Sequence, residues 1–145
     1  METMISKEHI QIIESVSDWK EALTNVVDPL IRDGFVEPRY LDGIFENTEK
    51  FGPYYVIAPN IAFPHARSEQ GAIHKAMSIL LLKKPVKFSS DGYDVRLLVA
   101  LSAPDSQSHL ESLVKLSDLL GEKETVDSIL QASSVEELYE FFKKI

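Results

Sequence analysis

Apolar residues occur along this chain with two different spacings, which predict two kinds of secondary structure. Runs of β-branched and other apolar residues, some alternating with polar ones, predict strands. Apolar residues three or four positions apart predict helices that bury one face. The predicted strands span residues 10–16, 54–57, 61–63, 77–82 and 95–101. The predicted helices span residues 19–33, 40–50, 106–120, 125–130 and 135–145.

Residues that favour helix ends stand at several of the predicted boundaries. Asp18 with Glu21, and Ser134 with Glu137, have the spacing of a capping box, in which two side chains satisfy backbone amides at a helix start. Gly34 follows the first predicted helix, where a glycine commonly ends the helical conformation. These signals support the helix predictions independently of the apolar pattern.

The predicted strands indicate a sheet that is covered on both faces. Residues 77–82 form a nearly continuous apolar run, and residues 95–101 carry apolar side chains on both alternating faces. We interpret residues 85–92, which begin with a proline and end with a glycine, as the connection between these two strands. Helices precede, separate and follow the strands, and no repeat or linker is evident. The sequence therefore predicts a single α/β domain over residues 1–145, a mixed β-sheet with helices packed on both faces.

Composition and charge narrow the classes of function. With 145 residues, 44% hydrophobic and 26% charged, the chain has the size and balance of one globular domain. The absence of cysteine excludes disulfides and a thiolate nucleophile within this chain. A formal charge of −8, without a Lys/Arg stripe, argues against nucleic acid and favours a basic protein partner. Because no secretory signal or apolar run of about 18 to 20 residues is present, we expect a cytoplasmic protein without membrane insertion.

The most informative stretch is a Pro-His-Ala-Arg sequence that follows a short apolar run. Pro64 fixes its own φ and biases Phe63 toward an extended conformation, so His65 leaves the backbone at a defined point. An imidazole with a free nitrogen can act as a nucleophile, a base or a metal ligand. Arg67 could neutralise negative charge beside it, or could be a cation of a surface loop.

A second histidine occupies the apolar face of a predicted helix. Counting back four positions from Leu113 reaches His109, in the first turn of a helix that Asp105 or Ser106 can cap. Functional groups in open α/β sheets gather at strand ends. If the sheet brings the two strand ends together, His65 and His109 meet at one rim. His109 could then donate to a charged group, or could bond only to a carbonyl at the helix start.

Other chemistries have weaker support in the residue pattern. A zinc site made of His65, His109 and His74 lacks a close His spacing or an acidic pair, although a metal-dependent hydrolase stays open on this basis. No serine stands in a nucleophile-elbow context, and no glycine-rich loop with a lysine is built to bind ATP. His9 and His74 have polar neighbours and are predicted to lie on the surface.

Two segments resemble a known family. The stretch 52–67, GPYYVIAPNIAFPHAR, and the downstream stretch 108–120, SHLESLVKLSDLL, resemble the mannitol/fructose-type enzyme IIA domains of the bacterial phosphoenolpyruvate:sugar phosphotransferase system (PTS). The flanking helices fit as well, so the resemblance covers essentially the whole chain. The variant GPYYVIAP is most similar to the ascorbate-type branch, which implies ascorbate or a related pentose or polyol as the sugar.

The resemblance implies a phosphocarrier that needs no cofactor and no metal. His65 would accept a phosphoryl group from the histidine-containing phosphocarrier protein (HPr). It would pass the group to a cysteine of a cognate enzyme IIB, which works with the membrane enzyme IIC. His109 would lie beside His65 and donate to the phosphoryl oxygens. The alternative is a regulatory binding module derived from the PTS that signals through phosphorylation of His65.

One position departs from the family pattern. Mannitol-type members carry an arginine shortly before the loop that leads to the active histidine, whereas this chain has Asn47, Thr48, Glu49 and Lys50 there. Either Arg67 takes over the charge, or Asn47 and Thr48 supply neutral hydrogen-bond donors. The departure argues against mannitol as the sugar.

Overall fold

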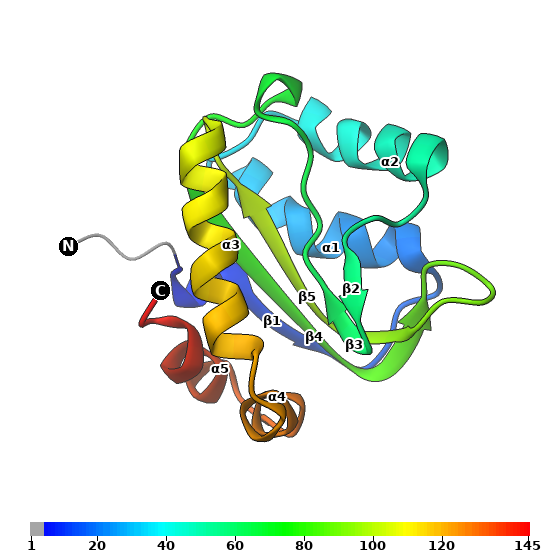
Figure 1. The fold of residues 1–145 in the computed structure, drawn as a ribbon, viewed down its shortest axis with the longest axis vertical. Helices are drawn as coiled ribbons and strands as arrows, with labels where there is room; N and C mark the ends of the chain where they lie inside the picture. The colour runs from blue at the N-terminus through cyan, green and yellow to red at the C-terminus, as the bar shows by residue number, and fades with distance from the viewer. Residues whose placement is uncertain (1–4) are drawn as a thin grey trace.

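A five-stranded mixed sheet forms the centre of the computed structural model, which describes residues 5–145 (Figure 1). Across the sheet, the strands follow the order β1 (Ile10–Ile13), β4 (Ala76–Lys87), β5 (Asp94–Ser102), β3 (Asn60–Ala62) and β2 (Val56–Ala58). The pairs β1–β4 and β3–β5 are parallel. The pairs β4–β5 and β2–β3 are antiparallel. The sheet is therefore mixed, as predicted.

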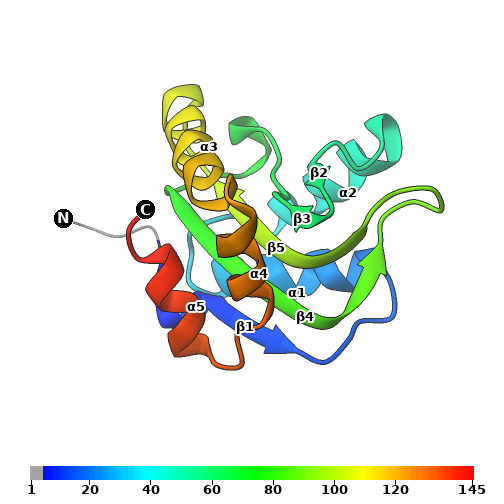
Figure 2. The same cartoon turned by 60° about the horizontal axis from the view of Figure 1, so that its bottom comes forward.

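Helices cover both faces of this sheet and create two separate cores. One face carries α1 (Trp19–Arg32) and α2 (Arg39–Phe51). The other face carries α3 (Ser106–Leu120), α4 (Lys123–Leu130) and α5 (Val135–Phe142), which lie in front of the sheet in Figure 2. Because side chains alternate along a strand, β4 contributes to both cores. Its residues Leu80 and Leu82 pack with the first pair of helices, and Ile79 and Leu81 pack with the other three.

Some predicted boundaries were wrong. The interpretation of residues 85–92 as a connection is wrong for residues 85–87, because β4 continues through Pro85 to Lys87, and is confirmed for residues 88–92. The register between β4 and β5 shifts between Leu81 and Val86, and such an irregularity admits a proline that cannot donate a ladder hydrogen bond. Strand β2 begins at Val56, since the two tyrosines before it form a turn. Strand β1 ends at Ile13, earlier than predicted.

The capping predictions are confirmed in part. The Asp18 carboxylate accepts a hydrogen bond from the Glu21 amide at 2.9 Å. The Glu21 carboxylate, however, accepts from the amide of Ser17 at 3.0 Å, so the reciprocal half of the capping box is made one residue earlier. Of the two candidates at the start of α3, Asp105 is the N-cap, and its carboxylate accepts from the Ser108 amide at 2.7 Å. This cap fixes the start of α3.

The prediction that His9 lies on the surface was wrong. Its side chain is buried, and Nε2 lies 2.7 Å from a carboxylate oxygen of Asp33. The ring also meets the edge of Phe35, with centroids 5.3 Å apart. These contacts join the turn at Lys7–His9 to the end of α1. His74 is exposed, as predicted.

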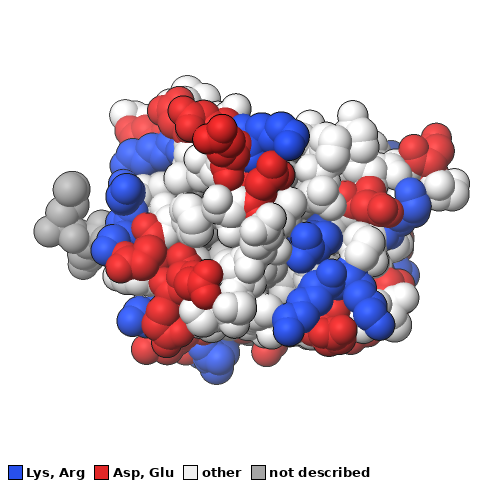
Figure 3. Space-filling model, turned by 90° about the horizontal axis from the view of Figure 1, so that it is seen from below, with Lys and Arg blue, Asp and Glu red and all other residues white. Residues whose placement is uncertain are grey.

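Charged residues of both signs are mixed on the end of the molecule shown in Figure 3. This view looks from below in the orientation of Figure 1, at the end opposite the N-terminus of α3. Acidic and basic side chains lie close together there, around a central area of neutral residues. Within residues 5–145, no helix has the length and apolar character needed to cross a membrane.

Candidate functional site

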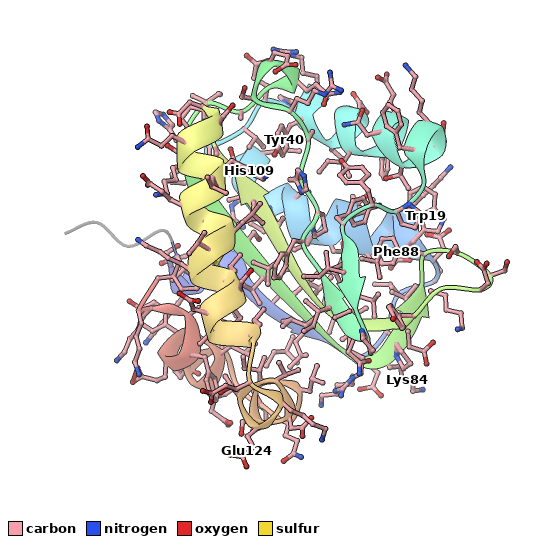
Figure 4. The ribbon with its side chains drawn as sticks, viewed as in Figure 1. Trp19, Tyr40, Lys84, Phe88, His109 and Glu124 are labelled. Atoms are coloured by element: carbon pink, nitrogen blue, oxygen red, sulfur yellow. The ribbon has the colours of Figure 1, made fainter. Side chains whose placement is uncertain are left out.

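The two candidate histidines meet at one rim of the sheet. Strands β3 and β5 are parallel neighbours, so their carboxyl ends lie at the same edge. His65 follows β3 by three residues, and His109 belongs to α3, which follows β5. The imidazole centroids are 4.7 Å apart, with ring planes inclined by 48°. Figure 4 places His109 on α3 at this end of the sheet. The structure therefore brings together the pair that the sequence predicted.

Main-chain hydrogen bonds hold the segment that presents His65. The Phe63 amide donates to the Tyr55 carbonyl at 2.9 Å. The Leu101 amide, at the end of β5, donates to the Pro64 carbonyl at 3.0 Å. The segment is thus anchored on one side to the turn before β2 and on the other side to β5, and its backbone is fixed immediately before His65.

The orientation of the His65 ring identifies its free nitrogen. Nδ1 lies 2.8 Å from the carbonyl oxygen of Phe63. Because a carbonyl can only accept, Nδ1 carries the proton and Nε2 keeps the lone pair. Nε2 has no hydrogen-bond partner among residues 5–145. Burial lowers the pKa of His65 below 6.5, and the bond to the Phe63 carbonyl only partly opposes this effect. His65 is therefore neutral and nucleophilic at neutral pH.

His109 is half-buried and shares this environment. Burial lowers its pKa, and the neighbouring His65 lowers it further by disfavouring a second positive charge nearby. Both rings are consequently neutral at neutral pH. An anionic group placed between them would reverse the charge effect and favour protonation of His109, which then becomes a donor.

A pocket of about 610 Å³ opens around the two rings. Arg67 lines this pocket, is exposed and has no ion pair with any residue that the structure describes. The N-terminal end of α3 lines the pocket through Asp105 and Ser106. A helix N-terminus carries partial positive charge, and here the Asp105 carboxylate takes up part of it by accepting from the Ser108 amide. The pocket thus places the Arg67 guanidinium and the start of α3 beside a neutral nucleophile, while Glu69 and Asp105 also line it. Arg67 is the cation in this lining that an anion could meet.

The two residues predicted as neutral donors have different positions. Asn47 lines the pocket, and its amide group donates to Gln70 Oε1 at 2.9 Å. The same Gln70 oxygen accepts from the Arg67 amide at 2.9 Å, so Asn47 helps to hold the loop. Thr48 is buried and does not line the pocket. Its hydroxyl lies 2.7 Å from both the Ile44 carbonyl and the Tyr55 hydroxyl.

Two tyrosines were missed as site residues. Tyr54 lines the pocket, meets the His65 ring edge-on at a centroid distance of 5.2 Å and donates to the His65 carbonyl. Tyr40 was predicted only as an apolar residue, and its hydroxyl accepts from the Ala66 amide. The sequence did contain one signal, the adjacent pair Tyr54 and Tyr55 before the Pro-His-Ala-Arg sequence. We interpreted this pair only as part of a strand.

The structure does not bring His74 to the pair. Its ring packs against Phe35, with centroids 6.0 Å apart. Across the described part of the chain, no group of three or more His, Cys, Asp or Glu residues could hold a metal ion. The zinc arrangement of His65, His109 and His74 therefore has no geometric support.

Comparison with known proteins identifies the class. Residues 3–145 match the family model described as "Phosphoenolpyruvate-dependent sugar phosphotransferase system, EIIA 2". The chain belongs to this family. Enzyme IIA components are phosphotransferases with a phosphohistidine intermediate, and the chain is a phosphocarrier for sugar uptake.

Individual relatives cover nearly the whole chain. It is 37% identical over 135 residues to the mannitol-specific cryptic phosphotransferase enzyme IIA component of Escherichia coli (strain K12), covering 93% of this chain and 92% of that protein. It is 32% identical over 145 residues to the ascorbate-specific PTS system EIIA component of the same organism, covering 99% and 94%. The names of these two relatives give two different sugars.

Solved structures share the fold. The solution structure of the mannitol-specific cryptic enzyme IIA from Escherichia coli superposes with a TM-score of 0.91 at 35% identity, covering 98% of this chain and 97% of that chain. Mannitol enzyme IIA from Escherichia coli, solved in complex with phosphorylated mannitol enzyme IIB, superposes with a TM-score of 0.86 at 20% identity, covering 97% and 98%. The mixed sheet with helices on both faces is thus the fold of this family.

Proposed function

We propose that His65 is the phosphoryl-carrying residue of this enzyme IIA, and that the protein works in the cytoplasm between HPr and an enzyme IIB. The hydrogen bond from Nδ1 to the Phe63 carbonyl carries this proposal, because it leaves Nε2 unprotonated in the pocket. Nε2 is therefore the nitrogen that accepts the phosphoryl group. Arg67 and the start of α3 lie where they can neutralise the group's charge.

The transfer needs positioning and charge stabilisation more than further covalent machinery. The Nε2 lone pair of His65 attacks the phosphorus of phosphohistidine on HPr. A new P–N bond forms while the donor P–N bond breaks, and the electron pair returns to the donor imidazole. In the second transfer, a cysteine thiolate of enzyme IIB attacks the same phosphorus, and His65 Nε2 recovers its lone pair. No proton has to leave His65 before the first attack.

His109 contributes most once the phosphoryl group is present. It lies within 4.7 Å of His65 between ring centroids, and an adjacent anion favours its protonated form. A protonated His109 donates a charge-assisted hydrogen bond to a phosphoryl oxygen, which stabilises the developing negative charge. We assign His109 as a stabilising donor and His65 as the nucleophile.

The names of the relatives support a class of sugar and not one particular sugar. The named relatives handle mannitol, a polyol, or ascorbate, and we propose ascorbate or a related pentose or polyol for this chain. The decisive partner is the enzyme IIB, which works with the membrane enzyme IIC. Phosphoryl transfer from this protein to a panel of ascorbate-type and mannitol-type enzymes IIB measures the preference directly.

The test of the carrier role is an intact-mass assay with phosphoenolpyruvate, enzyme I and HPr. Wild type should gain one acid-labile phosphoryl group, whereas His65→Ala should gain none. His74→Ala is the matched control, because His74 is exposed and lies against Phe35, and it should behave as wild type. A phosphorylated His65→Ala protein would refute the assignment of the residue.

The same assay separates the regulatory alternative. Addition of enzyme IIB should discharge the phosphorylated protein, and replacement of the enzyme IIB cysteine by serine should prevent discharge. A protein that accepts the phosphoryl group but transfers it to no enzyme IIB in the panel would favour a regulatory module over a carrier.

A further inference from the structure

The peptide group that joins His65 to Ala66 is held between two tyrosine hydroxyls. The Tyr54 hydroxyl donates to the His65 carbonyl, and the Tyr40 hydroxyl accepts from the Ala66 amide at 3.0 Å. These two polar groups belong to one planar unit, so each tyrosine holds one end of it. The preceding part of the loop is held by backbone partners, whereas this peptide depends on side chains.

Tyr40 anchors this peptide group to the sheet. Its side chain is 1% exposed, and its hydroxyl donates to the Leu101 carbonyl at 2.7 Å. The hydroxyl thus donates its proton to β5, and an oxygen lone pair remains to accept from the Ala66 amide. Burial raises the pKa of Tyr40 to about 12, so the hydroxyl stays protonated. Figure 4 shows Tyr40 at the same end of the sheet as His109.

Tyr54 holds the other end of the peptide group from the pocket wall. Its side chain is 40% exposed, and its ring packs edge-on against Tyr55, with centroids 4.9 Å apart. Burial raises the pKa of Tyr54 more than a hydrogen bond with the Asn47 side chain and the charge of Arg67 lower it, so the hydroxyl stays protonated. Its ring also meets the edge of the His65 imidazole.

We propose that Tyr54 and Tyr40 are positioning residues for phosphoryl transfer, because together they fix the His65–Ala66 peptide group and with it the direction in which His65 presents Nε2. The inference rests on the proposed function of His65. The peptide group after the His65 Cα atom is held by the two tyrosines, and the ring is held by the bond from Nδ1 to the Phe63 carbonyl, so these contacts together restrict rotation of the imidazole. In-line attack is sensitive to such displacement.

The substitution Tyr54→Phe tests the proposal because it removes one exposed hydroxyl and keeps the ring. Tyr93→Phe is the matched control, since Tyr93 is 52% exposed and does not line the pocket around His65. At saturating phospho-HPr, Tyr54→Phe should accept the phosphoryl group about tenfold more slowly, the equivalent of one hydrogen bond of about 1.4 kcal/mol. Tyr93→Phe should match wild type.

A second measurement follows the His65 ring and needs no phosphoryl donor. Nitrogen-15 NMR reports the tautomer, and the fraction with the proton on Nδ1 should fall in Tyr54→Phe and stay unchanged in Tyr93→Phe. Tyr40→Phe should show the same changes more strongly, because it leaves the buried Ala66 amide without a partner.

Two outcomes would overturn the proposal. A Tyr54→Phe rate within twofold of the Tyr93→Phe rate excludes a positioning role in transfer. A slower rate with an unchanged tautomer ratio shows that the hydroxyl acts by another route. Failure of wild type itself to accept a phosphoryl group counts against the proposed function instead, and the tautomer measurement then still decides whether the two tyrosines orient the ring.

Discussion

At the scale of single residues, the site depends on one imidazole kept neutral and oriented. Its Nδ1 atom bonds to the carbonyl two residues earlier in the chain, at Phe63. Burial keeps the ring neutral, because it disfavours the charged form of His65 and so lowers its pKa. In this site, a backbone carbonyl fixes the tautomer and orientation of the catalytic histidine, and burial keeps it neutral. Other enzymes use a carboxylate partner to fix the tautomer and orientation.

The lowered pKa of His65 predicts how phosphoryl acceptance depends on pH. Because the folded-state pKa lies below 6.5, the nucleophile stays unprotonated at pH values where an ordinary histidine is already charged. The acceptance rate should therefore fall in acidic solution with a midpoint below pH 6.5. A rate profile with phospho-HPr, paired with an NMR titration of His65, checks this. A midpoint at or above 6.5 would contradict the burial argument.

Arg67 is the exposed cation of the pocket, and its removal should slow the transfer. A charge-assisted hydrogen bond to a phosphoryl oxygen contributes about 1 to 3 kcal/mol, or roughly fivefold to 160-fold in rate. Arg67→Ala should therefore lower the rate by that factor and leave the thermal midpoint unchanged, since the described residues offer its side chain no ion pair. Arg32→Ala, at the end of α1, is the control for the transfer rate alone, because Arg32 is paired with Asp33 and its loss affects stability. Equal rates for both variants would remove Arg67 from the site.

At the scale of elements, the start of α3 determines where His109 lies. Asp105 caps this helix by accepting from the Ser108 amide, and the first turn carries both the pocket wall and the second histidine. The apolar spacing of the helix was sufficient to predict that His109 faces inward. The cap had two sequence candidates, because aspartate and serine adjoin each other and both can accept.

Loss of the α3 cap should affect both stability and transfer. Asp105→Ala should lower the free energy of unfolding by about 1 kcal/mol and slow phosphoryl acceptance. Ser134→Ala removes a comparable cap from α5, where the Ser134 hydroxyl accepts from the Glu137 amide at 3.2 Å, and should lower stability without slowing acceptance. Asp105→Asn keeps a capping oxygen and should retain stability. Equal acceptance rates in Asp105→Ala and Ser134→Ala would show that α3 does not position His109.

Sequence patterns predicted the elements better than their side-chain contacts. The helices and the two long strands follow from apolar spacing, and the His65–His109 pair follows from their placement at strand ends. The buried His9 and the hydroxyl contacts of Tyr40 could not be predicted, because each depends on a partner 24 or more positions away, Asp33 or Ala66. The continuation of β4 through Pro85 depends on a local register shift that apolar spacing does not encode.

At the scale of the whole molecule, the order of strands creates the site. Strand β3 pairs with β5 although β4 lies between them in the chain. Each of β2 and β3 has only three residues, and Pro59 alone joins them. Asn60, the first residue of β3, adopts a positive φ of 69°. The sequence predicted the mixed α/β class, but such short strands contain too little pattern to reveal their neighbours.

Global stability should depend on pH through Asp33. Its hydrogen bonds to Arg32 and His9 lower the pKa of the carboxyl from 3.8 to about 2. A depressed carboxyl pKa stabilises the fold above the unfolded-state value, and that contribution is lost as the pH falls from about 4 to about 2. Asp33→Asn should be less stable than wild type at pH 7, and the difference should shrink across this acid range. Denaturant unfolding of both proteins, at pH 7 and across this acid range, measures the difference in their free energies of unfolding. A difference that does not change with pH would exclude this linkage.

The pairing of β4 with β5 has a consequence for how activity reports on the folded state. Between the two histidines, the chain runs the length of β4 away from the pocket, turns, and returns along β5. His65 precedes this hairpin and His109 follows it, so the two residues come together only when β4 and β5 are paired. Opening this hairpin, even briefly, would separate His65 from His109. The rate of phosphoryl acceptance should thus depend on the pairing of β4 with β5, and so on changes in the sheet that lie far from the pocket.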